Sequence, residues 1–386
     1  MEVKPEIHPT ANIVVVGVGG SGNNAINRMV KAKFGGVTFI SINTDAQALH
    51  HSEAHQKVHI GKNTTKGLGA GSDPDVGKKS AEENIEELKK SLEGADMVFI
   101  TCGMGGGTGS GAAPVIADLA HNEIGALTIG VVTKPFSFEG VRRMDVANSS
   151  IAALKDKVDS LIVVPNDKLL TIIDRKTSLI DSFGIVDDVL LQGVQGISDL
   201  ITVNGMINVD FADVRTIMKG AGSALMGIGY GSGEGRAEKA ARSAIDSPLL
   251  EISIEGAKGV LINITGGEDM SMFEVGEAAK VISEVVHPEA NIIFGTVIDE
   301  TFTDEIKITV IATGFDDKGE VGNSKVRSVF GKVAKTSDGD NNFFGNEGRA
   351  PRNRDMSSMD NAGSRPVDVE EDDEYDVPAF IRNKVK

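Results

Sequence analysis

Few cysteines, few clustered cations and no long apolar run limit what this sequence can be. A single cysteine, Cys102, permits no internal disulfide and is typical of a reducing cytosol. No apolar run approaches the ~18 residues of a membrane span, and the first residues lack a signal-peptide pattern. We therefore expect a cytoplasmic protein that does not insert into a membrane. The net charge of −17 argues against a nucleic-acid-binding surface, although it leaves room for a nucleotide bound by backbone amides and a metal ion.

The length of 386 residues and the alternating patterns predict an α/β protein of about two domains. In the first half, short apolar runs alternate with helix-length stretches, which predicts a parallel, doubly wound sheet. The runs expected to form strands are 12–16, 37–42, 97–101, 127–132 and 161–164. The stretches expected to form helices are 23–32, 80–92, 112–123 and 140–156.

A long amphipathic stretch, 178–202, predicts a single central helix that links this half to a second one. In the second half, Ile306, Ile308 and Val310 alternate with polar residues, which predicts a mixed sheet. The further strand patterns lie near 224–229, 258–264, 291–299 and 306–312, and the helix patterns near 233–247 and 272–286.

The seven-residue run GGGTGSG, 105–111, predicts a loop that binds phosphate. It lies between the strand-like run 97–101 and a helix-like run that begins at Ala112. Its five glycines let backbone N–H groups converge on an anion, and the following helix adds the positive end of its dipole. Thr108 and Ser110 add hydroxyl donors. The run lacks the Gly-Lys-Ser/Thr ending of a Walker loop.

A second glycine loop, 17–22, reads GVGGSG and fits the pattern G-x-G-x-x-G, with Asp45 following a second predicted strand. A dinucleotide-binding fold begins in this way, so a nicotinamide-dependent oxidoreductase is one alternative. However, Asp45 lies past the predicted strand end, and a dinucleotide fold has no use for the loop at 105–111. Two glycine loops at the carboxyl ends of neighbouring parallel strands instead predict a site in which both loops bind one triphosphate from opposite sides.

These motifs resemble those of the FtsZ family, bacterial cell-division GTPases of the tubulin superfamily. The run 105–111 is similar to the superfamily signature in its length, its threonine position and its strand–loop–helix setting. The resemblance covers 12–315 almost continuously, resumes at 376–384, and implies a tubulin-like GTPase fold. The other blocks that carry it are 43–45, 67–71, 134–140, 165–170, 193–197 and 208–213.

The resemblance implies a GTP/GDP site in which Mg²⁺ is carried by the phosphates and water, with no certain protein ligand. Ser21 is a mild variant, because many family members have a smaller residue at that position. The residues expected to bind the nucleotide are Gly19, Gly20, Ser21, Gly22, Asn24, Asn43, Asp45, Gly69, Ala70, Gly71, Gly103, Gly105, Gly106, Gly107, Thr108, Gly109, Ser110, Thr133, Pro135, Glu139, Arg143, Asn166, Phe183 and Asp187.

Two pairs of residues are expected to hold the nucleoside. Phe183 can stack on guanine, and Asp187, four residues on, can accept hydrogen bonds from its N1–H and N2 amine, a donor pair that adenine lacks. Asn166 would contact the base or the ribose. Glu139 and Arg143 stand at i and i+4, a spacing that suits a hold on the ribose hydroxyls or a surface ion pair.

The family resemblance also implies that the loop 203–213 supplies catalysis to the next subunit. Asn208, Asp210 and Asp213 would reach the neighbour's nucleotide and polarise the attacking water, so hydrolysis would require head-to-tail polymerisation. The alternative role of the two acids is to cap the following helix. A non-hydrolysing GTP-binding scaffold of the same superfamily therefore remains a second alternative, against which the two acids argue.

A short apolar island, 376–384, follows a polar segment, 331–372, that reads as a disordered linker. Its similarity to the family's terminal peptide implies docking on membrane-tethered division adaptors at mid-cell. The residues expected to bind that partner are Asp376, Pro378, Phe380, Ile381 and Arg382.

The expected division of the chain follows from these features. It comprises a flexible N-terminus at 1–11, a GTP-binding domain at 12–177, a central helix at 178–202, a catalytic loop and helix at 203–219, a C-terminal domain at 220–315, a mostly disordered linker at 316–372 and a docking peptide at 373–386.

Overall fold

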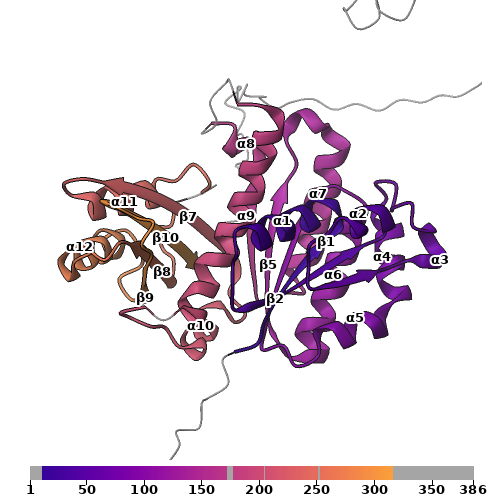
Figure 1. Ribbon diagram of the computed structural model, residues 1–386, viewed down its shortest axis with the longest axis horizontal. Coiled ribbons are helices and arrows are strands. Elements are labelled where there is room, and N and C mark those ends of the chain that lie inside the picture. The colour runs from indigo at the N-terminus through magenta and orange to yellow at the C-terminus, as the bar shows by residue number, and fades with distance from the viewer. Residues whose placement is uncertain (1–10, 172–176, 204, 251–252, 316–386) are drawn as a thin grey trace, which may run out of the picture. The chain divides into compact units, whose positions relative to one another are not determined.

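The computed structural model describes residues 11–315, apart from 172–176, 204 and 251–252. The long central helix α9, Leu179–Thr202, confirms the single helix expected from the amphipathic stretch. Figure 1 shows it running between the earlier strands and helices on one side and the later ones on the other. The expected linker and docking peptide lie outside the described residues, as does most of the expected N-terminal segment.

Ten strands form one hydrogen-bonded sheet. The strands are β1 (Ile13–Val18), β2 (Val37–Asn43), β3 (Gln56–His59), β4 (Met97–Gly103), β5 (Leu127–Lys134), β6 (Ser160–Pro165), β7 (Gly222–Ser232), β8 (Gly259–Gly266), β9 (Asn291–Ile298) and β10 (Glu305–Thr313). Their order is β3-β2-β1-β4-β5-β6-β7-β10-β8-β9. Strands β1 to β6 pair in parallel, whereas β10 is antiparallel to β7 and β8, so the predicted parallel and mixed parts are confirmed. They join where β6 pairs with β7 over the short register from Ser160–Gly222 to Ile162–Ala224.

Helices cover both faces of the parallel strands because successive strand residues point to opposite faces. On β1, Ile13 and Val15 pack in a core with α1, α9 and α10, whereas Val14 and Val16 pack in a second core with α4 to α7. A third core joins β8 and β10 to α11 and α12.

The remaining helices are α1 (Gly19–Lys31), α2 (Ala46–His50), α3 (Lys62–Thr65), α4 (Pro74–Glu83), α5 (Ile85–Leu92), α6 (Thr108–Asp118), α7 (Val141–Lys155), α8 (Asn166–Leu169), α10 (Phe211–Met218), α11 (Arg236–Ile245) and α12 (Met272–Ser283). A π-helical segment spans Leu119–Ile124 and a 3-10 turn spans Ser137–Glu139.

Three expected helix boundaries were wrong. The stretch 80–92 is divided between α4 and α5 at Asn84, whose side-chain oxygen accepts a hydrogen bond from the N–H of Gly61 at 2.9 Å. Helices α1 and α6 begin earlier than expected, at Gly19 and Thr108, because part of each glycine loop is the first turn of the helix. The short elements β3, α2, α3 and α8 were not predicted.

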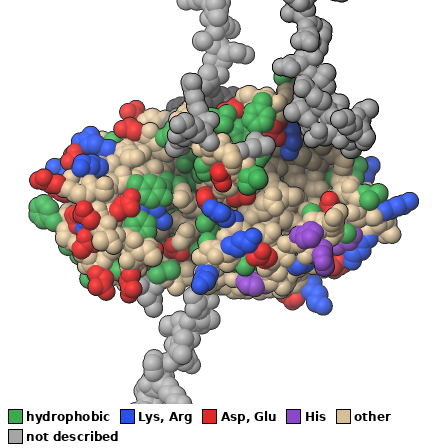
Figure 2. Space-filling view, turned by 45° about the horizontal axis from the view of Figure 1, so that its top comes forward, with side chains coloured by type: hydrophobic (Ala, Val, Ile, Leu, Met, Phe, Trp, Pro, Cys, Tyr) green, Lys and Arg blue, Asp and Glu red, His purple; other side chains and the backbone are tan. Residues whose placement is uncertain are grey.

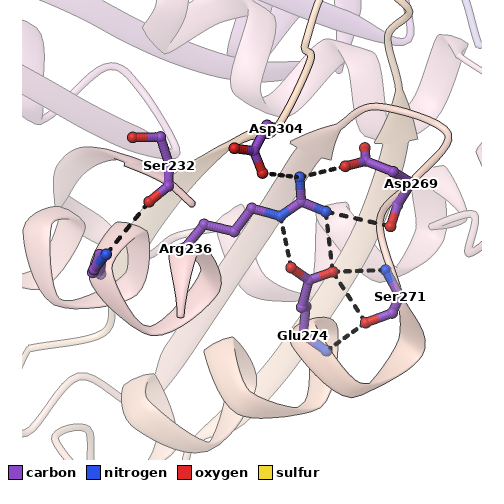
Figure 3. Close-up of polar contacts among 7 residues, drawn as sticks. Ser232, Arg236, Asp269, Ser271, Glu274 and Asp304 are labelled. Carbon is purple, nitrogen blue, oxygen red and sulfur yellow. Dashed lines mark hydrogen bonds and ion pairs between the residues drawn. The ribbon is translucent and has the colours of Figure 1, made fainter. Parts of the chain in front are cut away.

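A buried arginine fixes one end of the later sheet. Arg236, 6% exposed at its side chain, is bound by Asp269 and Glu274 at 2.6 Å each and by Asp304 at 3.7 Å (Figure 3). Glu274 also forms a capping box with Ser271 at the start of α12. The cluster therefore joins the start of α11, the start of α12 and the loop before β10.

The distribution of surface charge and the hydropathy of the helices can be stated for the described residues. Among the described residues on the face shown in Figure 2, Lys and Arg side chains are interspersed with Asp and Glu, and no continuous cationic patch forms. None of the helices within the described ranges is long and apolar enough to cross a membrane.

Candidate nucleotide-binding site

Two helix N-termini meet at the carboxyl ends of the neighbouring strands β1 and β4. Helix α1 begins at Gly19, directly after β1, and α6 begins at Thr108, after the turn that follows β4. Neither start has a side-chain cap, whereas Ser178 caps α9 and Ser271 caps α12. The first N–H groups of both helices, together with their dipoles, therefore favour an anion.

A cavity of about 440 Å³ opens in front of these two helix starts. Most of the residues expected to bind a nucleotide lie on its wall, and Val18, Met104 and Val186 join them without having been predicted. The expected residues on the wall are Gly19, Gly20, Ser21, Asn24, Gly103, Gly106, Gly107, Thr108, Gly109, Thr133, Pro135, Glu139, Arg143, Asn166, Phe183 and Asp187.

The positions on and beside the wall are occupied by glycine for different physical reasons. A Cβ atom on Gly103 would lie 2.9 Å from the Ser21 side chain, and one on Gly105 would lie 2.7 Å from the carbonyl oxygen of Arg143. At Gly105 the φ of +95° also disfavours any other residue. By contrast, a Cβ on Gly20 or Gly106 would meet no protein atom within 4 Å, which leaves open space where a ligand can approach the backbone.

One end of the cavity has the chemistry to bind a purine base. Phe183 is 44% exposed and packs edge-on against Phe136, with ring centroids 5.7 Å apart. The side-chain oxygen of Asn166 is buried without a hydrogen-bond partner. Burial, followed by the nearby charge of Asp188, raises the pKa of Asp187 to about 6. An unpaired buried acceptor beside an exposed ring and a carboxylate fits a ligand that donates hydrogen bonds.

Glu139 and Arg143 form an ion pair at 2.9 Å, but they do not share one helix as their spacing suggested. Glu139 ends the 3-10 turn, and Gly140, with a φ of +100°, separates it from α7. Glu139 also accepts a hydrogen bond from the N–H of Phe136 at 2.8 Å. Their contact with the ribose stays a prediction, and the alternative ion pair is present.

Several expected residues do not lie on the cavity wall. Asp45 accepts hydrogen bonds from the N–H groups of Gln47 and Ala48 and so caps α2. Ser110 accepts one from the N–H of Gly105 at 2.9 Å. A Cβ on Gly22 would lie 2.5 Å from the carbonyl oxygen of Thr101, so close packing explains that glycine. The complete set off the wall is Gly22, Asn43, Asp45, Gly69, Ala70, Gly71, Gly105 and Ser110.

Asn23 supports the first helix start and was not predicted from the sequence. In the amide orientation that satisfies its neighbours, its nitrogen donates to the carbonyl oxygens of Gly17 and Gly19 at 3.0 Å each, and its oxygen accepts from Asn43 at 3.1 Å. Asn43 in turn accepts from the N–H of Asp45 at 3.1 Å. The only sequence signal was the paired asparagine after the glycine loop, of which Asn24 was chosen.

The expected catalytic residues lie together, away from this cavity. Asp210 accepts a hydrogen bond from the N–H of Ala212 at 3.2 Å and so caps α10, and Asp213 lies in the first turn of that helix. Asn208 accepts one from the N–H of Gly205 at 2.7 Å. None of the three lines the cavity. The alternative capping role therefore applies to Asp210, while catalysis on another subunit stays a prediction.

Comparison with known proteins identifies the family. Residues 12–174 match the GTPase domain of the Tubulin/FtsZ family, and residues 222–316 match the C-terminal domain of the FtsZ family. The chain is 45% identical to FtsZ from M. jannaschii in an empty dimer, over 79% of this chain and 89% of that chain, with a TM-score of 0.76. The chain belongs to the FtsZ family. Membership assigns it to the tubulin-like, GTP-binding GTPases of the cell-division cytoskeleton.

Further solved structures share the fold. A single-residue variant of FtsZ from M. jannaschii is also 45% identical, over 79% of this chain and 92% of that chain, with a TM-score of 0.77. CetZ2 from Haloferax volcanii, solved as a GTPγS-bound protofilament, is 21% identical over 78% of this chain and 92% of that chain, with a TM-score of 0.65. At that identity the likeness shows the fold alone. The FtsZ-family assignment makes the loop at 17–22 part of a GTPase domain rather than a dinucleotide fold.

Proposed function

We propose that this chain is a cytoplasmic GTPase that assembles head-to-tail into filaments and forms a division ring at mid-cell. One observation carries the proposal. Among the described residues, the acids that line the cavity are Asp187, at the base end, and Glu139, which is paired with Arg143, while Asp210 and Asp213 lie elsewhere. Since this part of the chain places no free acid on the cavity wall near the two helix starts, we expect a second copy of the chain to supply one.

The geometry assigns distinct tasks to the chain's own groups. The uncapped starts of α1 and α6 would bind phosphates, while Phe183 and Asp187 would select guanine. Asp213, with Asp210 and Asn208, would orient water at the neighbour's nucleotide. Because each active site then uses two different surfaces, the contact is heterologous and generates an open filament. The dimer form of FtsZ from M. jannaschii, at 45% identity, supports self-association.

Mg²⁺ fits this site as a partner of the nucleotide rather than of a protein ligand set. No group of three or more His, Cys, Asp or Glu side chains within the described ranges could hold a metal ion. The ion would be coordinated mainly by phosphate oxygens and water, and when bound it would neutralise phosphate charge.

The terminal peptide would bind membrane-tethering adaptors through Asp376, Pro378, Phe380, Ile381 and Arg382.

Light scattering with GTP, run beside phosphate release, tests the proposal. We expect scattering to rise with GTP and Mg²⁺ but not with GDP or ATP, and phosphate release to increase steeply with protein concentration because two chains build each site. Filaments without phosphate release would favour the non-hydrolysing scaffold. Equal affinity for GTP and ATP would refute the guanine assignment.

A further inference from the structure

Thr44 is a fully buried residue that touches both the second helix start and a neighbouring loop. It follows the end of β2 and does not line the cavity. Its hydroxyl oxygen lies 2.7 Å from the hydroxyl oxygen of Thr108, the first residue of α6. Its carbonyl oxygen accepts hydrogen bonds from the Thr65 hydroxyl at 3.1 Å and from the N–H of Gly69 at 3.3 Å. One buried residue therefore joins the 65–69 loop to the phosphate-facing start of α6.

The order of the strands places Thr44 at the end of the site opposite the base. Asn166 follows β6, whereas Thr44 follows β2, and these strands lie four positions apart in the order β2-β1-β4-β5-β6. At roughly 4.8 Å per position, the separation is about 19 Å, the scale of an extended nucleoside triphosphate. The 65–71 loop lies on the same side, since a Cβ on Gly107 would be 2.8 Å from the Cβ of Ala70. Thr108 is thus placed toward the terminal phosphate.

A bound phosphate would decide which hydroxyl donates in the hydrogen bond between Thr44 and Thr108. A hydroxyl group has one proton to donate, and an ionised phosphate oxygen only accepts. If Thr108 donates its proton to phosphate, its oxygen must accept from Thr44. The Thr44 hydroxyl then has one role, to donate to Thr108 and hold its rotamer toward the ligand.

We propose that Thr44 is a positioning residue that fixes the Thr108 hydroxyl for the terminal phosphate of the nucleotide. This inference rests on the proposed GTP site and adds to it a selective preference for triphosphate over diphosphate. It also connects the 65–69 loop to that phosphate through the hydrogen bonds of the Thr44 carbonyl and hydroxyl groups.

Binding of GTPγS and of GDP to the full chain tests the proposal. Thr44→Val keeps the shape of the side chain but removes the donor, and Thr44→Ser keeps the donor. For Thr44→Val we expect the affinity for GTPγS to fall about tenfold while the affinity for GDP changes less than twofold, since a hydrogen bond to a charged group is lost only with the triphosphate. Thr44→Ser should restore the affinity for GTPγS to within twofold of the unmodified chain.

Thr128→Val is the matched control, because Thr128 is equally buried and its hydroxyl donates to the carbonyl oxygen of Ala126, two positions earlier in the chain, rather than to a residue of the cavity wall. It should leave both affinities unchanged, and thermal melting should show that all variants fold. If the unmodified chain binds neither nucleotide, the proposed function fails. If it binds both, but Thr44→Val matches it or weakens both ligands equally, the positioning role is overturned while the GTP site stands.

Discussion

At the scale of one residue, we expect Asp187 to make the recognition of guanine depend on pH. Its pKa is raised to about 6, mainly by burial, so it is ionised at pH 7 and about one tenth ionised at pH 5. Only the ionised form accepts both guanine donors, so the apparent affinity for GTP should fall about tenfold between these pH values. Calorimetric titrations across that range would measure the decrease.

The control for this prediction is Asp187→Asn, which keeps an acceptor oxygen but does not titrate. The affinity of this variant for GTP should change with pH only through titration of the phosphate groups of GTP itself. The same pH dependence in both proteins would show that another group titrates in this range.

The residues around the phosphates show where sequence reasoning succeeds and where it stops. The glycine positions follow from the motif because they reflect a local need for close backbone approach. Asn23, Asn43 and Asp45 were harder to assign, since all three are polar groups at strand or helix ends. Which of them faces a ligand and which binds a neighbouring backbone depends on contacts such as the one between Asn23 and Asn43, 20 positions apart in the chain.

At the scale of an element, the start of α10 carries the expected catalytic acids. Asp213→Ala should abolish GTP hydrolysis and leave GTP binding intact, because Asp213 lies outside the cavity of its own chain. Addition of this variant to the unmodified protein should lower phosphate release in proportion to mixed interfaces. A tenfold or larger loss of GTP affinity, roughly 1.4 kcal/mol, would contradict catalysis in trans. Asp210→Ala is a less clean test because it also removes the helix cap, at a cost of about 1 kcal/mol.

The Arg236 cluster determines how acid affects the elements around α11 and α12. Hydrogen bonds from Arg236 lower the pKa of Glu274 to about 2, so this pair stabilises the fold above the ordinary carboxyl pKa and loses its effect as pH falls from about 4.5 toward 2. Arg236→Ala should lower the free energy of unfolding at pH 7 by about 3 kcal/mol, since it leaves carboxylates without their partner.

Urea denaturation at several pH values would test this, with a difference between the two proteins that shrinks below pH 4.5. Arg242→Ala is the control, because Arg242 is 65% exposed at its side chain and pairs with Glu238 on its own helix. Its effect should stay below about 0.5 kcal/mol. A pH-independent difference for Arg236→Ala would show that packing, rather than charge, explains its contribution.

The boundaries of the elements show a second limit of the sequence. Periodicity identified α9 because one apolar face repeats along it, whereas most strands were identified as short apolar runs because they are buried on both faces. It missed the break between α4 and α5 at Asn84, whose side-chain oxygen accepts a hydrogen bond from the N–H of Gly61, 23 positions earlier in the chain. It also missed β3, a strand of four residues whose alternation is too short to distinguish from a loop.

At the scale of the whole molecule, assembly and membrane recruitment should be separable. Deletion of 373–386 should preserve GTP hydrolysis and filament formation in solution, because the cavity and the α10 acids lie within 11–315. It should abolish recruitment of filaments to vesicles that carry the adaptor, and Phe380→Ala should reproduce most of that loss. Sedimentation with and without such vesicles measures both effects. Loss of polymerisation in solution would show that the terminal peptide has a different role.

Because α1 and α6 have no side-chain caps, a nucleotide bound at their starts would complete the protein's secondary structure. A phosphate at these helix starts would take the place that Ser178 occupies on α9 and that Ser271 occupies on α12. Binding would then complete two helices at once, and the first turns of both should exchange their amide hydrogens more slowly. A ligand at a hundred times its dissociation constant adds about 2.7 kcal/mol to folding stability. We therefore expect the supply of nucleotide to regulate how firmly the chain is folded as well as whether it assembles.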